Sequence, residues 1–177
     1  NTIATGAMLV VLIWVFGPIS GAHFNPAVTI AFALRGEISP RDSASYILVQ
    51  VLGGLVGMIV AHLMFDLSLL QESTKVRTGL GQWAAEGVAT FGLVATIVGC
   101  LRARPDAVAM AVGLYITAGY WFTASTSFAN PAVTVARSFT DTFPGIQPGD
   151  APAFIGMQFA GAVLAVLVMR WLWRDAD

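Results

Sequence analysis

A five-residue segment that occurs twice constrains the fold of this chain more than any other feature. The letters NPAVT stand at residues 25–29 and again at residues 130–134, and an aliphatic residue and an alanine follow each copy. The surroundings match as well, because Gln50-x-x-Gly53 is answered downstream by Gln158-x-x-Gly161. Two copies in matching surroundings indicate that the chain consists of two structurally related halves.

Charged residues are few, and they leave long stretches of the chain without any charge. Of 177 residues, 56% are hydrophobic and only 11% are charged, and the mean hydropathy is +0.75. An average soluble domain has about one quarter charged residues. The charge-free stretches are residues 2–22, 43–65, 87–101, 107–125 and 151–169. Since about 20 apolar residues cross the hydrocarbon core of a bilayer, these stretches predict five membrane spans.

The number of spans between the two copies decides how the halves are oriented. Three spans separate them, at roughly residues 43–65, 82–101 and 106–125. An odd number of crossings inverts the second copy, so the copies approach the membrane midplane from opposite sides. Inverted repeats that meet at the midplane are typical of transporters and channels. The sequence therefore predicts an all-α membrane protein with an inverted repeat.

Each copy has the residues of a helix start. Asparagine is a preferred N-cap, and proline suits the first helical position because its missing N–H would have no partner there. A helix from Pro26 reaches Gly36 after about 15 Å, half the thickness of a membrane. We expect two half-helices, over residues 26–35 and 131–140, that meet end to end, with the spare amide N–H groups of both asparagines facing a cavity. Plain helix capping is the alternative interpretation of the asparagines.

Net charge and cysteine content exclude several classes of site. Nine basic and ten acidic residues give a net charge of −1, so no basic surface is available for nucleic acid. The one cysteine, Cys100, cannot form an intramolecular disulfide or a cysteine-based metal cluster. His23 and His62 belong to different segments without a third ligand nearby, so we expect no metal site and no cofactor.

In its motifs, the chain resembles the aquaporin and glycerol-facilitator family. Ser20 to Thr29, with the triplet Asn25-Pro26-Ala27, is similar to that family's first signature loop, and Asn130-Pro131-Ala132 is similar to its second. Similarity extends over the spans at Tyr46, Gln50, Gly53, Glu86 and Gly113 to Tyr120. The resemblance implies a single channel domain with an aquaporin-like fold, of which five full spans and two half-helices are present and the family's first span is absent. Because the chain opens at Asn1 almost inside a span, we expect a fragment or a processed start.

The resemblance also implies a function. Members of the family are passive channels for water and small uncharged solutes, exclude protons and ions, and assemble as homotetramers. Residues 126–141 are similar to bacterial members linked with arsenic resistance, so polyols and arsenite-like hydroxides are the expected solutes. We expect the lipid bilayer of a bacterial inner membrane as the surroundings, and neither an enzyme activity nor a nucleic-acid partner.

The family's selectivity filter, carried over residue by residue, falls on Thr5, Tyr120, Ser127 and Val133. The last position usually holds an arginine, and here the nearest one, Arg137, follows four residues later, about 6 Å further out in the outer vestibule. A filter without that cation should be wider and less polar. The resemblance further implies that His23 and Glu86 support the two loops.

Basic residues predict the orientation of the chain in the membrane. One side would carry Lys75, Arg77 and Arg137, and the other side would carry Arg35, Arg41, Arg102, Arg104, Arg170 and Arg174. The positive-inside rule makes the second side cytoplasmic, and with it the C-terminus. We expect a first repeat over residues 1–65, an external loop over residues 66–81 and a second repeat over residues 82–177.

Two other classes of membrane protein remain as alternatives. A coupled secondary transporter shares inverted repeats, but it is expected to carry ionisable residues at the broken points, where this chain has Asn, Pro, Ala and Val. An intramembrane enzyme needs a nucleophile and its base, and Ser125, Ser127 and His23 have no third group to orient them. The repeated, uncharged motif favours the channel.

Overall fold

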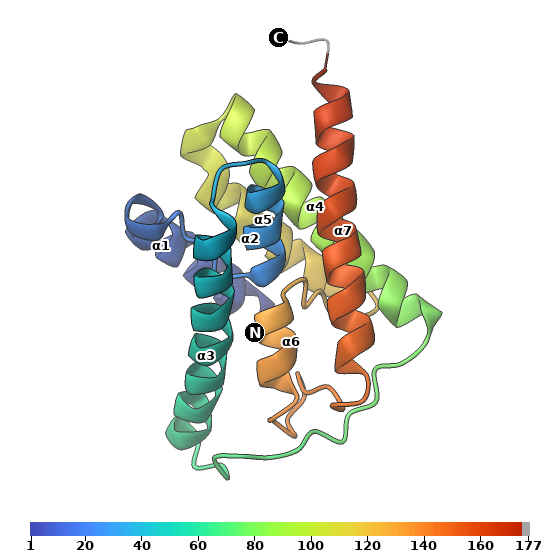
Figure 1. Cartoon of the computed structure of the whole chain (residues 1–177). Helices are drawn as coiled ribbons and strands as arrows, with labels where there is room; N and C mark the ends of the chain where they lie inside the picture. Colours follow the sequence, from blue (N-terminus) through green and yellow to red (C-terminus); the bar gives the residue numbers. More distant parts are fainter. Residues whose placement is uncertain (175–177) are drawn as a thin grey trace.

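The computed structural model describes residues 1–174, and every regular element within them is a helix (Figure 1). In chain order these elements are α1 (Thr2–Ser20), α2 (Pro26–Leu34), α3 (Pro40–Met64), α4 (Leu80–Ala103), the 3₁₀ helix η1 (Pro105–Ala107), α5 (Val108–Phe122), α6 (Pro131–Arg137) and α7 (Ala151–Leu172). Five long helices surround the two short ones, α2 and α6, which begin within the two copies of the motif. The predicted all-helical architecture is confirmed.

Four of the described helices, α1, α3, α4 and α7, are long and apolar enough to cross a membrane. The remaining expected span is shorter than predicted, because α5 has 15 residues and ends at Phe122 instead of near residue 125. Thr123 takes an extended conformation (φ −108°, ψ 135°), and Thr126 and Ser127 have positive φ. The chain thus leaves the helix early and turns into the loop before the second copy of the motif.

Both short helices begin as predicted and end sooner. Asn25 caps α2, its Oδ1 accepting from the amide of Ala27 at 2.9 Å, and Asn130 caps α6, its Oδ1 accepting from the amide of Ala132 at 3.0 Å. The predicted ends at residues 35 and 140 are wrong, since α2 ends at Leu34 and α6 at Arg137. After α6 the backbone tightens into i→i+3 hydrogen bonds, which close the helix.

Glycines let the long helices approach one another closely. A Cβ atom built on Gly161 of α7 would clash with the carbonyl oxygen of Gly87 in α4. The helices α1 and α5 cross in the same manner, since a Cβ atom at Gly113 would lie 2.6 Å from the carbonyl oxygen of Gly6. Backbone packs directly on backbone at both crossings, as is common between membrane helices.

The helix α2 lies against α4 and α7 in a core of small side chains. Ala27 and Ala31 of α2 are buried together with Val94 and Val98 of α4 and with three residues of α7, Ala162, Ala165 and Val166. Alanines allow the short helix to approach both neighbours closely. The first half-helix is therefore held on two sides by the second repeat.

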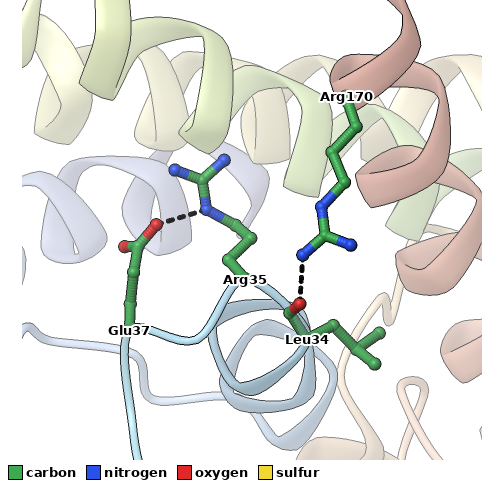
Figure 2. Close-up of polar contacts among 4 residues, drawn as sticks. All are labelled: Leu34, Arg35, Glu37 and Arg170. Atoms are coloured by element: carbon green, nitrogen blue, oxygen red, sulfur yellow. Dashed lines mark hydrogen bonds and ion pairs between the residues drawn. The ribbon is translucent and has the colours of Figure 1, made fainter.

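The C-terminal end of α2 is fixed by polar contacts, which Figure 2 shows. Arg170 of α7 donates a hydrogen bond to the carbonyl oxygen of Leu34, in the last turn of α2. Beside it, Arg35 and Glu37 form an ion pair at 2.5 Å. A cation at the last carbonyl groups of a helix is favourable because the dipole is negative there.

Apart from the two loops that precede Asn25 and Asn130, the connecting segments gather at two opposite ends of the molecule. The turn between α2 and α3, the junction of α4 and α5, and the C-terminal end of α7 lie at the top of Figure 1. The long segment between α3 and α4 and the segment between α6 and α7 lie at the bottom. These lower segments bind each other, for example through the amide of Ser73, which donates to the carbonyl oxygen of Ser138 at 3.1 Å.

Candidate functional site

The two motif asparagines lie where the short helices meet. Asn25 Nδ2 donates to the carbonyl oxygen of Ala129 at 2.6 Å, and Asn130 Nδ2 donates to the carbonyl oxygen of Phe24 at 2.9 Å. Each side chain therefore binds the backbone of the opposite repeat as well as capping its own helix. Because a side-chain amide has two N–H donors, each asparagine retains one beyond this contact.

The loops before the two asparagines have the same unusual backbone. Positive φ values occur at equivalent positions of the two loops: at Gly21 and Thr126, at Ala22 and Ser127, and at Phe24 and Ala129. The two residues of each pair are as far apart in the sequence as Asn25 and Asn130 are. For residues other than glycine, this conformation costs roughly 1–2 kcal/mol each. Such strain persists only where surrounding contacts fix the backbone, and it marks these loops as functional segments.

Glu86 fixes the second loop from within the bundle. Its carboxylate is fully buried and accepts from the amides of Phe128 and Ala129, both at 2.8 Å. A third donor is Gln158 Nε2 at 2.6 Å, which also lies 2.8 Å from Thr134 Oγ1. Three protein donors therefore occupy the carboxylate, and Glu86 is not among the residues that line the central cavity.

The first loop is fixed by neutral groups. His23 Nδ1 lies 3.1 Å from Thr29 Oγ1, and Gln50 Nε2 donates to the same hydroxyl at 2.9 Å. Gln50 and Thr29 correspond to Gln158 and Thr134 of the second repeat. The described residues contain no carboxylate in the place that corresponds to Glu86, and Gln50 Oε1 is buried without a partner among them.

The packing of the two repeats differs in the same region. The helix α4 of the second repeat covers the alanines of α2. Over the corresponding part of α6 lies instead a cavity of about 630 Å³, which is lined by residues such as Gly54, Met58 and Ala136. No helix of the described residues fills it.

A second cavity, of about 210 Å³, lies between the repeats and is called the central cavity below. Its walls come from one face each of α1, α4 and α5, at a spacing of four residues or nearly so: Thr5, Leu9 and Ile13; Leu93, Ile97 and Leu101; Val108, Val112, Ile116 and Tyr120. From Val108 to Tyr120 it follows about 18 Å of α5. Sequence reasoning missed most of these residues, although their spacing marks one face of each helix.

The central cavity brings the predicted motif and filter residues together. Asn25 and Asn130 line it, as do Thr5, Tyr120, Ser127 and Val133. Pro26, Ala27, Pro131 and Ala132 do not line it and are buried in the first turns of the short helices. Ser127 is 2% exposed, and its hydroxyl has no hydrogen-bond partner among the described residues.

Arg137 also lines the central cavity. Its Nη2 donates to Tyr120 Oη at 3.1 Å, and its Cζ lies 4.2 Å from the ring centroid of Phe128. These contacts were not predicted, because they join the last residue of α6 to α5 and to a loop. Arg77, from the segment after α3, places its Cζ 4.9 Å from the same ring.

Both histidines bind protein groups. His62 Nδ1 lies 3.0 Å from the carbonyl oxygen of Leu69, and its Nε2 lies 2.7 Å from Thr140 Oγ1. Among the described residues, no three side chains of His, Cys, Asp or Glu gather in a way that could hold a metal ion.

Comparisons with known proteins identify relatives over the whole chain. The sequence profile of the family described as Major intrinsic protein matches residues 1–106 and residues 100–176. Aquaglyceroporin AqpS of Rhizobium meliloti (strain 1021) is 61% identical over 176 residues, which are 99% of this chain and 76% of that protein. Aquaporin-4 of Mus musculus is 33% identical over 76% of this chain, and Aquaporin NIP1-1 of Zea mays is 30% identical over 97% of it. The chain spans 44% of the length of the mouse protein and 61% of the length of the maize protein.

Proposed function

The chain belongs to the major intrinsic protein family, and from this premise we propose that it conducts water and small uncharged solutes passively across a membrane. The observation that carries the proposal is the pair Asn25 and Asn130, which line one cavity from the two repeats. The names of its relatives, aquaglyceroporin and aquaporin, support the same function. The family consists of channels, so the protein is not assigned an enzymatic reaction.

The short helices give the middle of the central cavity a positive potential. Their N-termini begin at Asn25 and Asn130, and each is equivalent to about half a positive charge, as in other aquaporin-type pores. This potential opposes the passage of cations. A water molecule that accepts from the remaining asparagine N–H donors must turn its oxygen toward them. The file of water-to-water hydrogen bonds is then interrupted, which opposes proton hopping.

The proposed selectivity filter consists of Thr5, Tyr120, Ser127 and Val133, all of which line the central cavity. Val133 offers neither charge nor hydrogen-bond donor, so this position leaves more room than an arginine would. We propose polyols and neutral arsenite-like hydroxides as solutes that such a filter passes. The asparagines, which bind solutes only through hydrogen bonds, suit hydroxylated compounds.

Orientation and assembly are part of the proposal. The turn between α2 and α3, the junction of α4 and α5, and the C-terminal end of α7 lie at one end of the molecule (Figure 1). These segments carry the larger group of basic residues, which supports a cytoplasmic location for that end and for the C-terminus. The rhizobial relative supports a bacterial inner membrane. A homotetramer is proposed from the family, and apolar side chains on the outer faces of α1, α3 and α7 suit contact with lipid or with neighbouring copies.

A coupled secondary transporter is the competing function. Such a protein needs an ionisable group that gains and loses an ion or proton during transport. Glu86 is the carboxylate inside the bundle, and its three hydrogen-bond donors are protein groups that hold the second loop. The geometry therefore favours a structural role for Glu86 and a passive channel.

Flux measurements on proteoliposomes test the proposal. Stopped-flow light scattering should show water and glycerol permeabilities well above those of empty liposomes. Imposed pH gradients or membrane potentials should leave the glycerol flux unchanged, because the flux follows the solute gradient alone. Uphill solute uptake driven by either gradient would instead assign the protein to the coupled transporters.

A further inference from the structure

Arg137 is the one residue with a permanent charge among the described residues that line the central cavity. We propose that Arg137, together with Ser127, forms the polar side of the selectivity filter and supplies the cation that Val133 lacks. This inference rests on the proposed channel function and names the group that selects among solutes.

The path of the Arg137 side chain carries the inference. Val133 and Arg137 lie four residues apart on one face of α6, so the backbone of Arg137 is about 6 Å further from the midplane. The side chain reaches one of the filter residues, because Nη2 donates to Tyr120 Oη at 3.1 Å. Tyr120 and Val133 both line the central cavity. The guanidinium is therefore in direct contact with a filter residue.

A buried aromatic ring holds the guanidinium from a second direction. Arg137 Cζ lies 4.2 Å from the ring centroid of Phe128, which is 4% exposed. A guanidinium at this distance from a ring is attracted by its π-electrons. The backbone of Phe128 is itself fixed by Glu86. Two separate elements, α5 and the second loop, thus position Arg137.

The neighbouring cation, Arg77, is occupied by the backbone. Its Nε donates to the carbonyl oxygen of Gly145 at 2.7 Å, and its Nη1 donates to that of Ser125 at 3.2 Å. Burial, and then repulsion by Arg137, lower the pKa of Arg77, while Glu86 raises it. Among the described residues no carboxylate lies within ion-pair distance of Arg137. This mouth of the cavity therefore has a positive potential that opposes cations.

Ser127 supplies the second polar group. Ser127 lines the cavity, and its buried hydroxyl has no protein partner among the described residues, so its donor and its acceptor are both unused by the protein. Guanidinium has five N–H donors, of which one contacts Tyr120. A small polyol can accept from the others through a hydroxyl oxygen and bind Ser127 with a second hydroxyl, while its carbon chain contacts Val133. The filter selects for such neutral polyhydroxylated solutes and against cations.

Substitutions at Arg137 separate charge from size. In proteoliposomes, Arg137→Gln should raise both methylammonium uptake and the erythritol-to-water permeability ratio at least about threefold, because the charge is lost and the lumen widens. Arg137→Lys should keep methylammonium excluded, since it retains the charge. Tyr120→Phe removes only the hydroxyl that positions the guanidinium, and it should shift both quantities in the same direction as Arg137→Gln, by less.

Arg104→Gln is the matched control, because Arg104 is exposed near the junction of α4 and α5 and lies 3.4 Å from Asp106. Size-exclusion profiles and melting temperatures should show that all variants fold. If methylammonium uptake and the erythritol-to-water ratio of Arg137→Gln lie within twofold of those of Arg104→Gln, the inference is overturned and the channel function still stands. A wild-type protein no more permeable to water or glycerol than empty liposomes would overturn both.

Discussion

Gln158 Nε2 lies 2.6 Å from a carboxylate oxygen of Glu86, and both side chains are fully buried between α7 and α4. The same carboxylate accepts from the loop that precedes Asn130, so Glu86 connects that loop to α7. In the first repeat, Gln50 has the corresponding position in α3, and its Oε1 is buried without a partner among the described residues. The two halves of the molecule therefore share a backbone design but differ in how completely the described residues support it.

Glu86→Gln should loosen the second loop. The substitution replaces one acceptor oxygen by an N–H₂ group. This donor then faces another donor, either a backbone amide or Gln158 Nε2, and a buried N–H group is left without an acceptor. The expected loss of stability is about 2–3 kcal/mol. Thermal unfolding in detergent, followed by tryptophan fluorescence, measures it. Glu72→Gln, an exposed change in the segment after α3, is the control and should leave the melting temperature unchanged.

Gly161→Ala should separate α7 from α4. The new methyl group would clash with the carbonyl oxygen of Gly87, and backbone cannot yield as a flexible side chain does. Overpacking of this kind costs about 1–3 kcal/mol. Gly156→Ala in the same helix is the matched control, since a Cβ atom there meets no atom within 4 Å. Equal melting temperatures for the two variants would contradict direct backbone packing at this crossing.

Val133→Arg should narrow the filter. A second guanidinium beside Arg137 adds bulk and charge, so passage of glycerol-sized or arsenite-like solutes should fall about tenfold while water flow is comparatively spared. Val133→Leu adds a methylene group without charge and should have a smaller effect on the same ratio. Separate stopped-flow measurements for water and for each solute decide the matter. An unchanged solute-to-water ratio in Val133→Arg would show that residue 133 does not face the narrow part of the pore.

The contact between Asp141 and Thr74 should weaken in acid. The amide and the hydroxyl of Thr74 both donate to Asp141 Oδ1 at 2.9 Å, and they hold the pKa of Asp141 below its ordinary value of 3.8. Because the folded-state pKa is the lower one, the stabilisation is complete above pH 3.8 and is lost as the pH falls through the folded-state pKa. The contact of Thr74 with the segment after α6 should then weaken, while backbone hydrogen bonds such as that from Ser73 to Ser138 still join the two segments.

Hydrogen-exchange protection of the Thr74 amide, measured between about pH 2 and 5, tests this expectation. Protection should fall with pH in the wild type and should be low throughout in Asp141→Ala, which removes the acceptor oxygen. Glu72→Gln should behave as the wild type does. Protection that is independent of pH in the wild type would mean that Asp141 does not hold this segment in solution.

Much of the architecture could be predicted from the sequence because membrane insertion depends on local properties. A charge is costly in lipid wherever it stands, so the charge-free stretches locate the long helices. The Asn-Pro pairs locate the starts of both short helices, since capping involves neighbouring residues only. Helix ends were less well predicted. The helix α6 stops three residues early because its last turn tightens, and no residue type in that turn demands this.

By itself, the sequence determined the inverted repeat and the starts of the short helices at Asn25 and Asn130. Only the tertiary structure decided which groups face the central cavity and where the charge of Arg137 lies. An arginine side chain can reach several ångströms in many directions, and its position depends on Tyr120 and Phe128, which come from other elements. Local patterns determine where helices form in a membrane, whereas the chemistry of a pore depends on contacts between segments far apart in the chain.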